Sequence, residues 1–323
     1  MGEIVSDATT LLRNGRVAVI GAGLMGHGIA QVFARTGCRV DLYDVSEDLL
    51  DQAFRNIGRN LETFVGEGLE TASNVRRILS RIRPVLDLQD AVRDADFVVE
   101  AAPEDPGIKK DLFTRLDAAA PGHAILASNT SMLSISEFGA GCRKRDRQII
   151  THWFNPPHIV PVVEVVAGEK TSDETVEVTL ALLRAAGKQP VRVQKEIPGF
   201  LVNRIQTAMF REVLSLLEQG VASAEDIDTA IKGSFGLRLG AVGVLETMDM
   251  AGLDLMLKGT TYLYRHIEST DTPQKILEDK VAKGELGVKT GKGFYAYDSP
   301  APEGDPRDAV KTRDRNLLRL LKE

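Results

Sequence analysis

A glycine-rich turn between two predicted strands constrains the fold of this 323-residue chain more than any other feature. Residues 17–20 (VAVI) have the pattern of a buried strand, and Gly21-Ala22-Gly23-Leu24-Met25-Gly26 follows directly. Apolar periodicity over 25–36 predicts a helix that ends at Gly37, and 39–43 (RVDLY) predicts the next strand. A strand, a G-x-G-x-x-G turn, a helix and a second strand form the first unit of a parallel, doubly wound sheet.

The turn has the residue types that a dinucleotide requires. Gly21 permits the tight turn, Gly23 lets the backbone approach a pyrophosphate, and Gly26 lets the helix pack closely on the strand. The helix N-terminus then offers free N–H groups and the positive end of its dipole to the phosphates. The predicted cofactor contacts in the turn are Gly21, Gly23, Leu24, Met25 and Gly26.

An acidic residue at the end of the second strand favours one form of the cofactor. Asp44 lies 23 residues after Gly21, where a carboxylate accepts hydrogen bonds from the ribose hydroxyls of the adenosine. The same carboxylate repels a 2′-phosphate. The sequence therefore predicts NAD rather than NADP, with Asp44 as a further cofactor contact.

The rest of the chain divides into an alternating part and a mainly helical part. Short apolar strands are predicted at 95–102, 123–129 and 148–154, with a helix at 108–120. This alternation predicts an α/β, Rossmann-like, doubly wound domain over residues 1–196. Residues 197–300 predict a mainly α-helical C-terminal domain, and 301–323 a polar C-terminal tail helix.

Composition excludes several classes of protein. With 43% hydrophobic and 27% charged residues, the chain matches an ordinary globular protein rather than a disordered one. Cys38 and Cys142 are too few for a disulfide framework or a metal cluster, and we expect no metal site. A net charge of −6 argues against a nucleic-acid partner. No apolar run approaches the ~20 residues of a membrane span, and without an evident leader segment we expect a cytoplasmic protein.

Further motifs lie along the rest of the chain, in SNTSMLS (128–134), THWFNPPHIVPVVE (151–164), PGFLVNR (198–204) and GVKTGKGFY (287–295). Together with the glycine-rich turn they resemble the L-3-hydroxyacyl-CoA dehydrogenase family over nearly all of residues 15–297. The resemblance implies a Rossmann-like domain, a helical C-terminal domain and a homodimer. It also implies NAD-dependent oxidation of the 3-hydroxy group of a 3-hydroxyacyl-CoA.

The same motifs supply the residues that alcohol oxidation needs. A base must take the hydroxyl proton while hydride leaves for the nicotinamide, and an imidazole is suited to this near neutral pH. By resemblance, His152 is that base, and Glu164 is the carboxylate that orients it and stabilises the imidazolium. Ser131 and Asn203 match the contacts to the reacting oxygen of the substrate. Because valines flank Glu164 on both sides, we expect an apolar setting in which the carboxylate needs a partner.

Three more cofactor contacts follow from the resemblance alone. The segment EAAPED (100–105) matches the family segment in which a glutamate and a following lysine approach the nicotinamide half of NAD. These positions are Glu104 and Lys109, and Asn129 matches another contact. For Lys109 a solvated loop charge is an equal alternative.

The small-molecule substrate has two candidate classes. In the family, Ser and Lys residues on the helices after the second strand approach the CoA phosphates, whereas 53–73 here contains Glu62, Glu67 and Glu70. The segment HWFNPPHIVPVVEVV also resembles relatives that act on small hydroxy acids or alcohols, in the gulonate dehydrogenase and lambda-crystallin branch and in a branch that oxidises a hydroxymethyl-pyridine acid. A 3-hydroxyacyl-CoA thioester is the leading prediction, and a small hydroxy acid or alcohol oxidised by the same chemistry is the alternative. A non-catalytic NAD-binding protein is the less favoured third interpretation.

Overall fold

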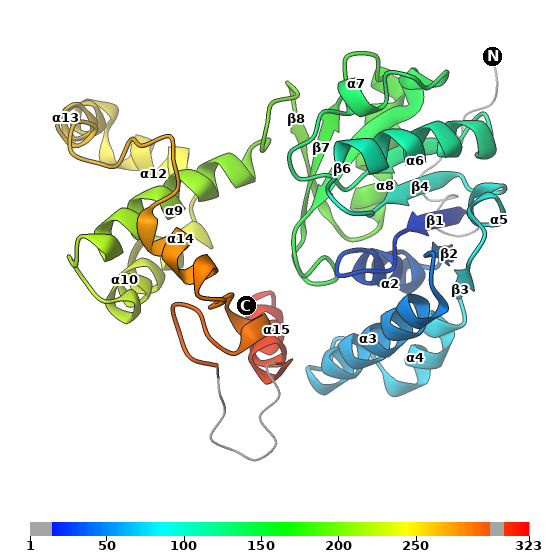
Figure 1. Ribbon diagram of the computed structural model, residues 1–323, viewed down its shortest axis with the longest axis horizontal. Helices are drawn as coiled ribbons and strands as arrows, with labels where there is room; N and C mark the ends of the chain where they lie inside the picture. The colour runs from blue at the N-terminus through cyan, green and yellow to red at the C-terminus, as the bar shows by residue number, and fades with distance from the viewer. Residues whose placement is uncertain (1–14, 298–306, 323) are drawn as a thin grey trace. The chain divides into compact units, whose positions relative to one another are not determined.

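A single twisted sheet forms the centre of the first part of the molecule (Figure 1). The structure, a computed structural model, describes residues 15–297 and 307–322. Within them one eight-stranded sheet has the order β3-β2-β1-β4-β5-β6-β7-β8, and only β6 and β7 pair antiparallel. The predicted α/β, doubly wound fold class is confirmed. The strands are β1 Arg16–Ile20, β2 Arg39–Tyr43, β3 Ile82–Val85, β4 Phe97–Glu100, β5 Ile125–Ser128, β6 Gln148–Trp153, β7 Val162–Ala167 and β8 Gln189–Val193.

Helices cover both faces of this sheet, which is why its central strands have almost no polar residues. Every residue of β4, β5 and β6 is buried, as expected for parallel strands with a helical layer on each side. One core packs α2, α3, α4 and α8 against the sheet, and the other packs α5, α6 and α7. These helices are α2 Gly26–Thr36, α3 Glu47–Gly66, α4 Ala72–Leu79, α5 Leu88–Val92, α6 Pro106–Ala119, α7 Ile135–Phe138 and α8 Asp173–Ala185.

Three strands, β3, β7 and β8, have no predicted range in the sequence analysis, and β3 and β8 are the two edge strands of the sheet. β3 has the sequence IRPV and β8 the sequence QPVRV, and each has exposed residues at its centre. Proline cannot donate to the hydrogen-bond ladder and is therefore confined to edges. An edge strand buries less surface, so neither segment has the apolar run that marks the central strands.

The second part of the described chain is helical, as predicted. Contacts group Arg204–Val310 as one compact unit, and they group residues up to Asn203 with Lys311 onward as the other. The helical unit has large apolar side chains exposed on several of its helices. No helix among the described residues is long and apolar enough to cross a membrane. The remaining helices of eight residues or more are α9 Val202–Glu218, α10 Ala224–Ile231, α12 Val244–Ala251, α13 Leu253–Leu263, α14 Lys275–Ala282 and α15 Arg307–Leu320.

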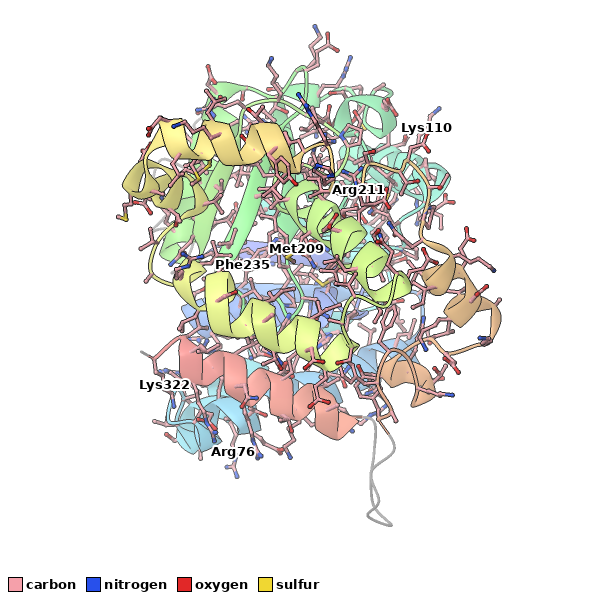
Figure 2. All side chains as sticks on the ribbon, turned by 90° about the vertical axis from the view of Figure 1, so that its left-hand side faces the viewer. Arg76, Lys110, Met209, Arg211, Phe235 and Lys322 are labelled. Atoms are coloured by element: carbon pink, nitrogen blue, oxygen red, sulfur yellow. The ribbon has the colours of Figure 1, made fainter. Side chains whose placement is uncertain are left out.

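The C-terminal helix α15 packs on α3 of the sheet-containing unit. Leu318, which is 1% exposed, forms a small apolar cluster with Phe64 of α3 and Ile159. Arg319 lies 3.4 Å from a carboxylate oxygen of Glu67, and Lys322, at the end of the helix in Figure 2, donates to the Glu67 carbonyl. A contact across some 250 residues of sequence thus joins the end of the chain to α3.

The first prediction concerns this helix. Replacing Leu318 with alanine removes the apolar anchor of α15, and such truncations cost about 2–5 kcal/mol where the side chain is buried. We expect faster amide hydrogen exchange over 311–320, with little change in the exchange of the central strands, because Leu318 belongs to neither main core. Leu320→Ala is the matched control, since Leu320 is 68% exposed. Equal exchange in both variants would show that Leu318 does not anchor the helix.

Candidate active site

The glycine-rich turn has the geometry that its residues predict. Gly21 has φ +106°, and a Cβ there would lie 2.6 Å from the Ala101 carbonyl oxygen. At Gly26 a Cβ would lie 1.7 Å from the Gly21 carbonyl oxygen, so the turn and the start of α2 leave no room for a side chain. The space around Gly23 is open to 4 Å. The turn therefore offers bare backbone at the one glycine that must approach a pyrophosphate.

The start of α2 is free for an anion. No side chain caps the helix at Met25, and no acidic residue lies in its first turn. Leu24 is 67% exposed beside it. The backbone N–H groups at such a helix start form a binding site for phosphate.

Asp44, which directly follows the neighbouring strand β2, accepts a hydrogen bond from the glycine-rich turn. Its Oδ2 accepts a hydrogen bond from Ala22 N at 2.7 Å, and its Oδ1 accepts one from Val45 N at 2.7 Å. The side chain is half-buried, and each carboxylate oxygen has a second lone pair. Asp44 thus fixes the loop and still has acceptor capacity for a pair of ribose hydroxyls.

His152 and Glu164 face each other across the antiparallel pair β6 and β7. They are directly opposite in the register, and His152 Nδ1 lies 2.7 Å from Glu164 Oε2. Both side chains are buried, at 4% and 0% exposure. The rings of Phe154 and Phe200 pack against the imidazole, with centroids 4.5 and 5.6 Å away. With Nδ1 bound to the carboxylate, Nε2 is the ring nitrogen left for a substrate.

The second oxygen of Glu164 binds the backbone just before and at the start of α9. Glu164 Oε1 accepts hydrogen bonds from Leu201 N at 2.9 Å and Val202 N at 2.8 Å. Burial alone raises the pKa of Glu164, but the hydrogen bonds from His152, Val202 and Leu201 outweigh it and hold the pKa below its usual value. The carboxylate is therefore charged at neutral pH, opposite the imidazole.

The Asn203 side chain lies beside the backbone of Ser131. Asn203 Nδ2 donates to the Ser131 carbonyl oxygen at 3.3 Å. Asn203 directly follows Val202, whose N–H binds Glu164. The hydrogen bonds thus link Asn203 to both Ser131 and, through the backbone, Glu164.

The three cofactor contacts inferred from resemblance are engaged within the protein. Lys109 is fully buried and lies 2.7 Å from Glu100 Oε1, so it is not a solvated loop charge. Glu104 Oε1 accepts from Ser131 N at 2.9 Å. Asn129 Oδ1 accepts from Trp153 N at 3.0 Å, which fixes the residue after His152.

Glu100 is a residue that the sequence analysis missed. It ends β4 within the apolar segment ADFVVEAA, and its side chain is 0% exposed. A carboxylate inside an apolar strand needs a partner, which is the argument that applies to Glu164. The same signal would have identified Glu100.

A buried lysine binds the loop between β6 and β7. Lys188 Nζ donates to the carbonyl oxygens of Pro157 at 2.6 Å and Val160 at 2.9 Å. Burial lowers the pKa of Lys188 to about 8, and burial together with nearby cations lowers the pKa of His158 to about 3. His27 and His158, to which the sequence assigned no role, are both buried.

Two of the three acidic residues that argue against a CoA substrate bind other side chains of the protein. Glu70 accepts from Asn74 at 2.7 Å and lies 3.4 Å from Arg35, while Glu67 binds Arg319 of α15 and Lys322 just after this helix. Glu62 is exposed. Two of the three carboxylates are therefore parts of the packing between α2, α3, α4 and α15.

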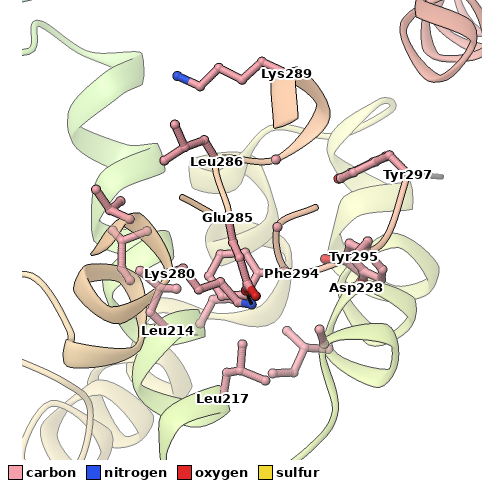
Figure 3. Close-up of a pocket in the computed structure, with 17 residues that line it drawn as sticks. Leu214, Leu217, Asp228, Lys280, Glu285, Leu286, Lys289, Phe294, Tyr295 and Tyr297 are labelled. Atoms are coloured by element: carbon pink, nitrogen blue, oxygen red, sulfur yellow. Dashed lines mark hydrogen bonds and ion pairs between the residues drawn. The ribbon is translucent and has the colours of Figure 1, made fainter. Parts of the chain in front are cut away.

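The segment GVKTGKGFY borders a cavity within the helical unit (Figure 3). The cavity has a volume of about 550 Å³ and an apolar lining from α9, α10 and α14, including Leu214, Leu217 and Phe294. Lys280 Nζ binds Glu285 at 2.7 Å beside it. None of the predicted catalytic residues lines this cavity.

Two family models match almost the whole described chain. Residues 16–197 match the 3-hydroxyacyl-CoA dehydrogenase NAD binding domain, and residues 199–297 match the 3-hydroxyacyl-CoA dehydrogenase C-terminal domain. The chain belongs to the 3-hydroxyacyl-CoA dehydrogenase family. The resemblance found in the sequence is confirmed, and the chain is an enzyme of the NAD-dependent dehydrogenases that act on hydroxyl groups.

Curated family members with two kinds of substrate are similar to the chain. The 5-formyl-3-hydroxy-2-methylpyridine 4-carboxylate 5-dehydrogenase of Mesorhizobium japonicum is 35% identical over 289 residues, covering 89% of this chain and 91% of that protein. The 3-hydroxybutyryl-CoA dehydrogenase of Clostridioides difficile is 38% identical over 286 residues, covering 87% and 99%.

Solved structures of the family give the same two groups. The crystal structure of the pyridine carboxylate dehydrogenase, described as an NAD+ dependent dismutase, has a TM-score of 0.86 at 33% identity and covers 95% of this chain and 97% of that one. That of (S)-3-hydroxybutyryl-CoA dehydrogenase from Ralstonia eutropha has a TM-score of 0.71 at 36% identity, covering 88% and 99%.

The match to an NAD-binding domain confirms NAD as the cofactor of this family member. The bare backbone at Gly23, the uncapped start of α2 and the half-buried Asp44 fit that dinucleotide.

A second prediction tests the turn. A Cβ at Gly26 would collide with the Gly21 carbonyl, and overpacking of this kind costs about 1–3 kcal/mol. We expect Gly26→Ala to raise the Kd for NAD, measured by titration calorimetry, by about tenfold or more. Gly58→Ala is the control, because Gly58 lies inside α3 with open space around it. Unchanged affinity in Gly26→Ala would contradict this account of the turn.

Proposed function

We propose that the chain oxidises a substrate hydroxyl with NAD, using His152 as general base and Glu164 as its orienting partner. The observation that carries the proposal is the buried 2.7 Å contact between His152 Nδ1 and Glu164 Oε2. A carboxylate on one ring nitrogen fixes the tautomer, so that the other nitrogen is an acceptor toward the substrate.

The proton and the hydride leave the substrate in different directions. His152 Nε2 takes the hydroxyl proton, and the charged Glu164 stabilises the resulting imidazolium without taking the proton itself. NAD, when bound, accepts the hydride from the same carbon. The phenyl rings of Phe154 and Phe200 exclude water from the imidazole, which strengthens its interaction with Glu164.

Ser131 and Asn203 hold the reacting oxygen in this proposal. Their donors polarise the carbonyl in the reductive direction and position the hydroxyl in the oxidative one. The hydrogen bond from Asn203 to the Ser131 carbonyl supports the assignment, since it places the Asn203 side chain beside the backbone of Ser131. Gly21, Gly23, Leu24, Met25, Gly26, Asp44, Glu104, Lys109 and Asn129 remain the proposed contacts to the cofactor.

A small hydroxy acid or alcohol is the substrate class that we favour. Family members that use CoA approach its phosphates from the helices after the second strand, and here α15 packs on α3 at Phe64 and Glu67. The similarity to the pyridine carboxylate dehydrogenase over 95% of the chain also supports this class. That relative is named for a formyl substrate, and a hydrated aldehyde has a hydroxyl on the carbon that loses hydride.

The 3-hydroxyacyl-CoA thioester expected from the sequence is the second candidate. It is supported by the identity of 38–39% to the bacterial 3-hydroxybutyryl-CoA dehydrogenase and to the human mitochondrial hydroxyacyl-coenzyme A dehydrogenase. The chemistry at His152 is the same for both classes, so only the binding of the substrate tail distinguishes them.

We also propose a homodimer formed through the helical unit. Helices α12 and α13 expose large apolar side chains, with Leu245 76%, Met250 77%, Leu253 60% and Leu257 67% exposed. Exposed large apolar side chains gathered on neighbouring helices are typical of an interaction site in a globular protein. A second copy satisfies it by symmetry, since each chain offers the same face.

The catalytic proposal predicts the behaviour of His152→Gln. Glutamine keeps a donor for Glu164 but cannot take a proton, and removal of a positioned base costs about 10²–10⁴-fold in rate. We expect kcat to fall by that factor, with the Kd for NAD unchanged. His123→Gln is the control, because His123 is partly exposed and binds Asp96. A folded His152→Gln enzyme with near-full turnover would overturn the mechanism.

The substrate proposal predicts how CoA affects the enzyme. A panel of small hydroxy acids, pyridine aldehyde acids and 3-hydroxyacyl-CoA esters, followed by NADH absorbance, identifies the class that is turned over. We expect a small acid to be oxidised and free CoA at millimolar concentration not to compete with it. Competitive inhibition by CoA, together with turnover of 3-hydroxybutyryl-CoA, would return the assignment to the thioester.

A further inference from the structure

His27, the second residue of α2, binds the glycine-rich turn through its side chain. The imidazole is buried, and its Nδ1 lies 2.7 Å from the carbonyl oxygen of Gly23, four residues earlier. A carbonyl oxygen only accepts hydrogen bonds, so Nδ1 carries a proton and donates it. A side chain of α2 thus holds the backbone of the glycine that must approach a pyrophosphate.

The Gly23 carbonyl accepts two hydrogen bonds from this one residue. The backbone N–H of His27 also donates to it, at 3.3 Å. A carbonyl oxygen has two lone pairs, and the imidazole and the backbone N–H use both. In a planar trans peptide the carbonyl and the N–H that follows it point in opposite directions. The two bonds that draw the Gly23 carbonyl toward α2 therefore aim the Leu24 N–H away from the helix.

The Leu24 N–H is available to a ligand, unlike the N–H groups at the start of the turn. The Gly21 N–H donates to the Tyr43 carbonyl oxygen at 2.8 Å. The Ala22 N–H donates to Asp44 Oδ2 at 2.7 Å. In the described part of the chain the Leu24 N–H has no protein acceptor, and Leu24 is 67% exposed. An unpaired N–H at the start of a helix is a donor for phosphate.

Packing from the loop between β6 and β7 surrounds the imidazole. The ring of His158 in that loop has its centroid 6.4 Å from that of His27. A Cβ at Gly28, the next residue of α2, would lie 2.7 Å from Pro157 Cγ, so the loop packs directly on the helix. Burial lowers the pKa of His27 more than the bond to Gly23 raises it, so the ring is neutral at neutral pH. Its action on the turn is therefore positional and adds no charge.

We propose that His27 is a positioning residue for the cofactor: its Nδ1–H fixes the Gly23 carbonyl and so aims the Leu24 N–H at the pyrophosphate of NAD. The imidazole acts through the backbone of the turn and needs no contact with the dinucleotide. The inference rests on the contact between Leu24 and the cofactor that belongs to the proposed function. It does not depend on the chemistry at His152, because binding of the pyrophosphate precedes the reaction.

The test asks which part of the dinucleotide loses affinity when the imidazole is removed. ADP-ribose contains the pyrophosphate, whereas adenosine lacks it and keeps only the ribose contact to Asp44. His27→Ala should raise the Kd for ADP-ribose, measured by titration calorimetry, about three- to tenfold, which corresponds to one hydrogen bond. The Kd for adenosine should stay within about twofold. His27→Asn should restore most of the ADP-ribose affinity, because its Nδ2–H is a donor at the same distance from Cβ as Nδ1–H.

His158→Ala is the packing control, because it removes the neighbouring buried ring and no bond to the turn. It should leave the Kd for ADP-ribose within about twofold. Equal weakening in His27→Ala and His158→Ala, or equal weakening of ADP-ribose and adenosine binding, would overturn the proposal, and so would a His27→Asn variant no better than His27→Ala. If His27→Ala does not fold, His27→Leu gives the same comparison, since leucine fills the site without a donor.

Kinetics and the imidazole tautomer separate this role from the catalytic one. The pyrophosphate does not react, so its contacts are equal in the ground and transition states. His27→Ala should therefore raise KM for NAD with kcat nearly unchanged, whereas His152→Gln lowers kcat. Nitrogen-15 shifts of the unliganded protein at neutral pH should show the His27 proton on Nδ1, and a proton on Nε2 alone would contradict the proposal. Weaker ADP-ribose binding in Gly26→Ala but not in His27→Ala would support the turn as the cofactor site and overturn the role of His27 alone.

Discussion

The arrangement of the site depends on the hydrogen bonds that the Glu164 carboxylate accepts. It lies in an apolar strand, where an ionised group is stable only if its hydrogen-bonding capacity is used. One oxygen binds His152 on the neighbouring strand, and the other binds the backbone N–H groups of Leu201 and Val202. A single side chain thus sets the imidazole and the start of α9, and with it Asn203. Loss of Glu164 would misplace all three.

Glu100 on β4 has a similar arrangement, three strands away from Glu164 on β7. It also lies in an apolar strand, where it binds the Lys109 ammonium and accepts hydrogen bonds from the Ala102 N–H and the Ser128 hydroxyl. Lys109, the partner of Glu100, lies 3.4 Å from Glu104, which accepts a hydrogen bond from the Ser131 N–H. Asn129 lies between the strands of these two glutamates, because it follows the end of β5. Its Oδ1 accepts a hydrogen bond from the N–H of Trp153, the residue after His152. Rigid second contacts of this kind are what keep a catalytic geometry within tenths of an ångström.

Local patterns predict the parts of this structure that local physics determines. The turn at Gly21–Gly26 depends on the absence of side chains, and the central strands depend on burial from both faces, so both are evident in sequence. His152 and Glu164 are twelve residues apart on paired strands, and the valines around Glu164 indicate its burial. The edge strands β3 and β8 lack that apolar signal. The local sequence does not determine the orientation of Lys109, because the same sequence also suits an exposed lysine at the start of a helix. Only the tertiary packing of α6 decides that its side chain is buried.

The acidic segment after β2 shows how a local charge pattern can mislead. Glu67 and Glu70 suggest a surface that repels phosphate, but in the folded chain each binds a basic side chain, and for Glu67 the partners come from α15 at the far end of the sequence. Charge alone therefore no longer argues against a CoA tail. The packing of α15 is the feature that bears on the proposed substrate class, because Leu318 joins Phe64 of α3 to Ile159 in the loop that follows His152. The proposal of a small substrate therefore rests on a contact made by the end of the chain and not on the local charge of the segment after β2.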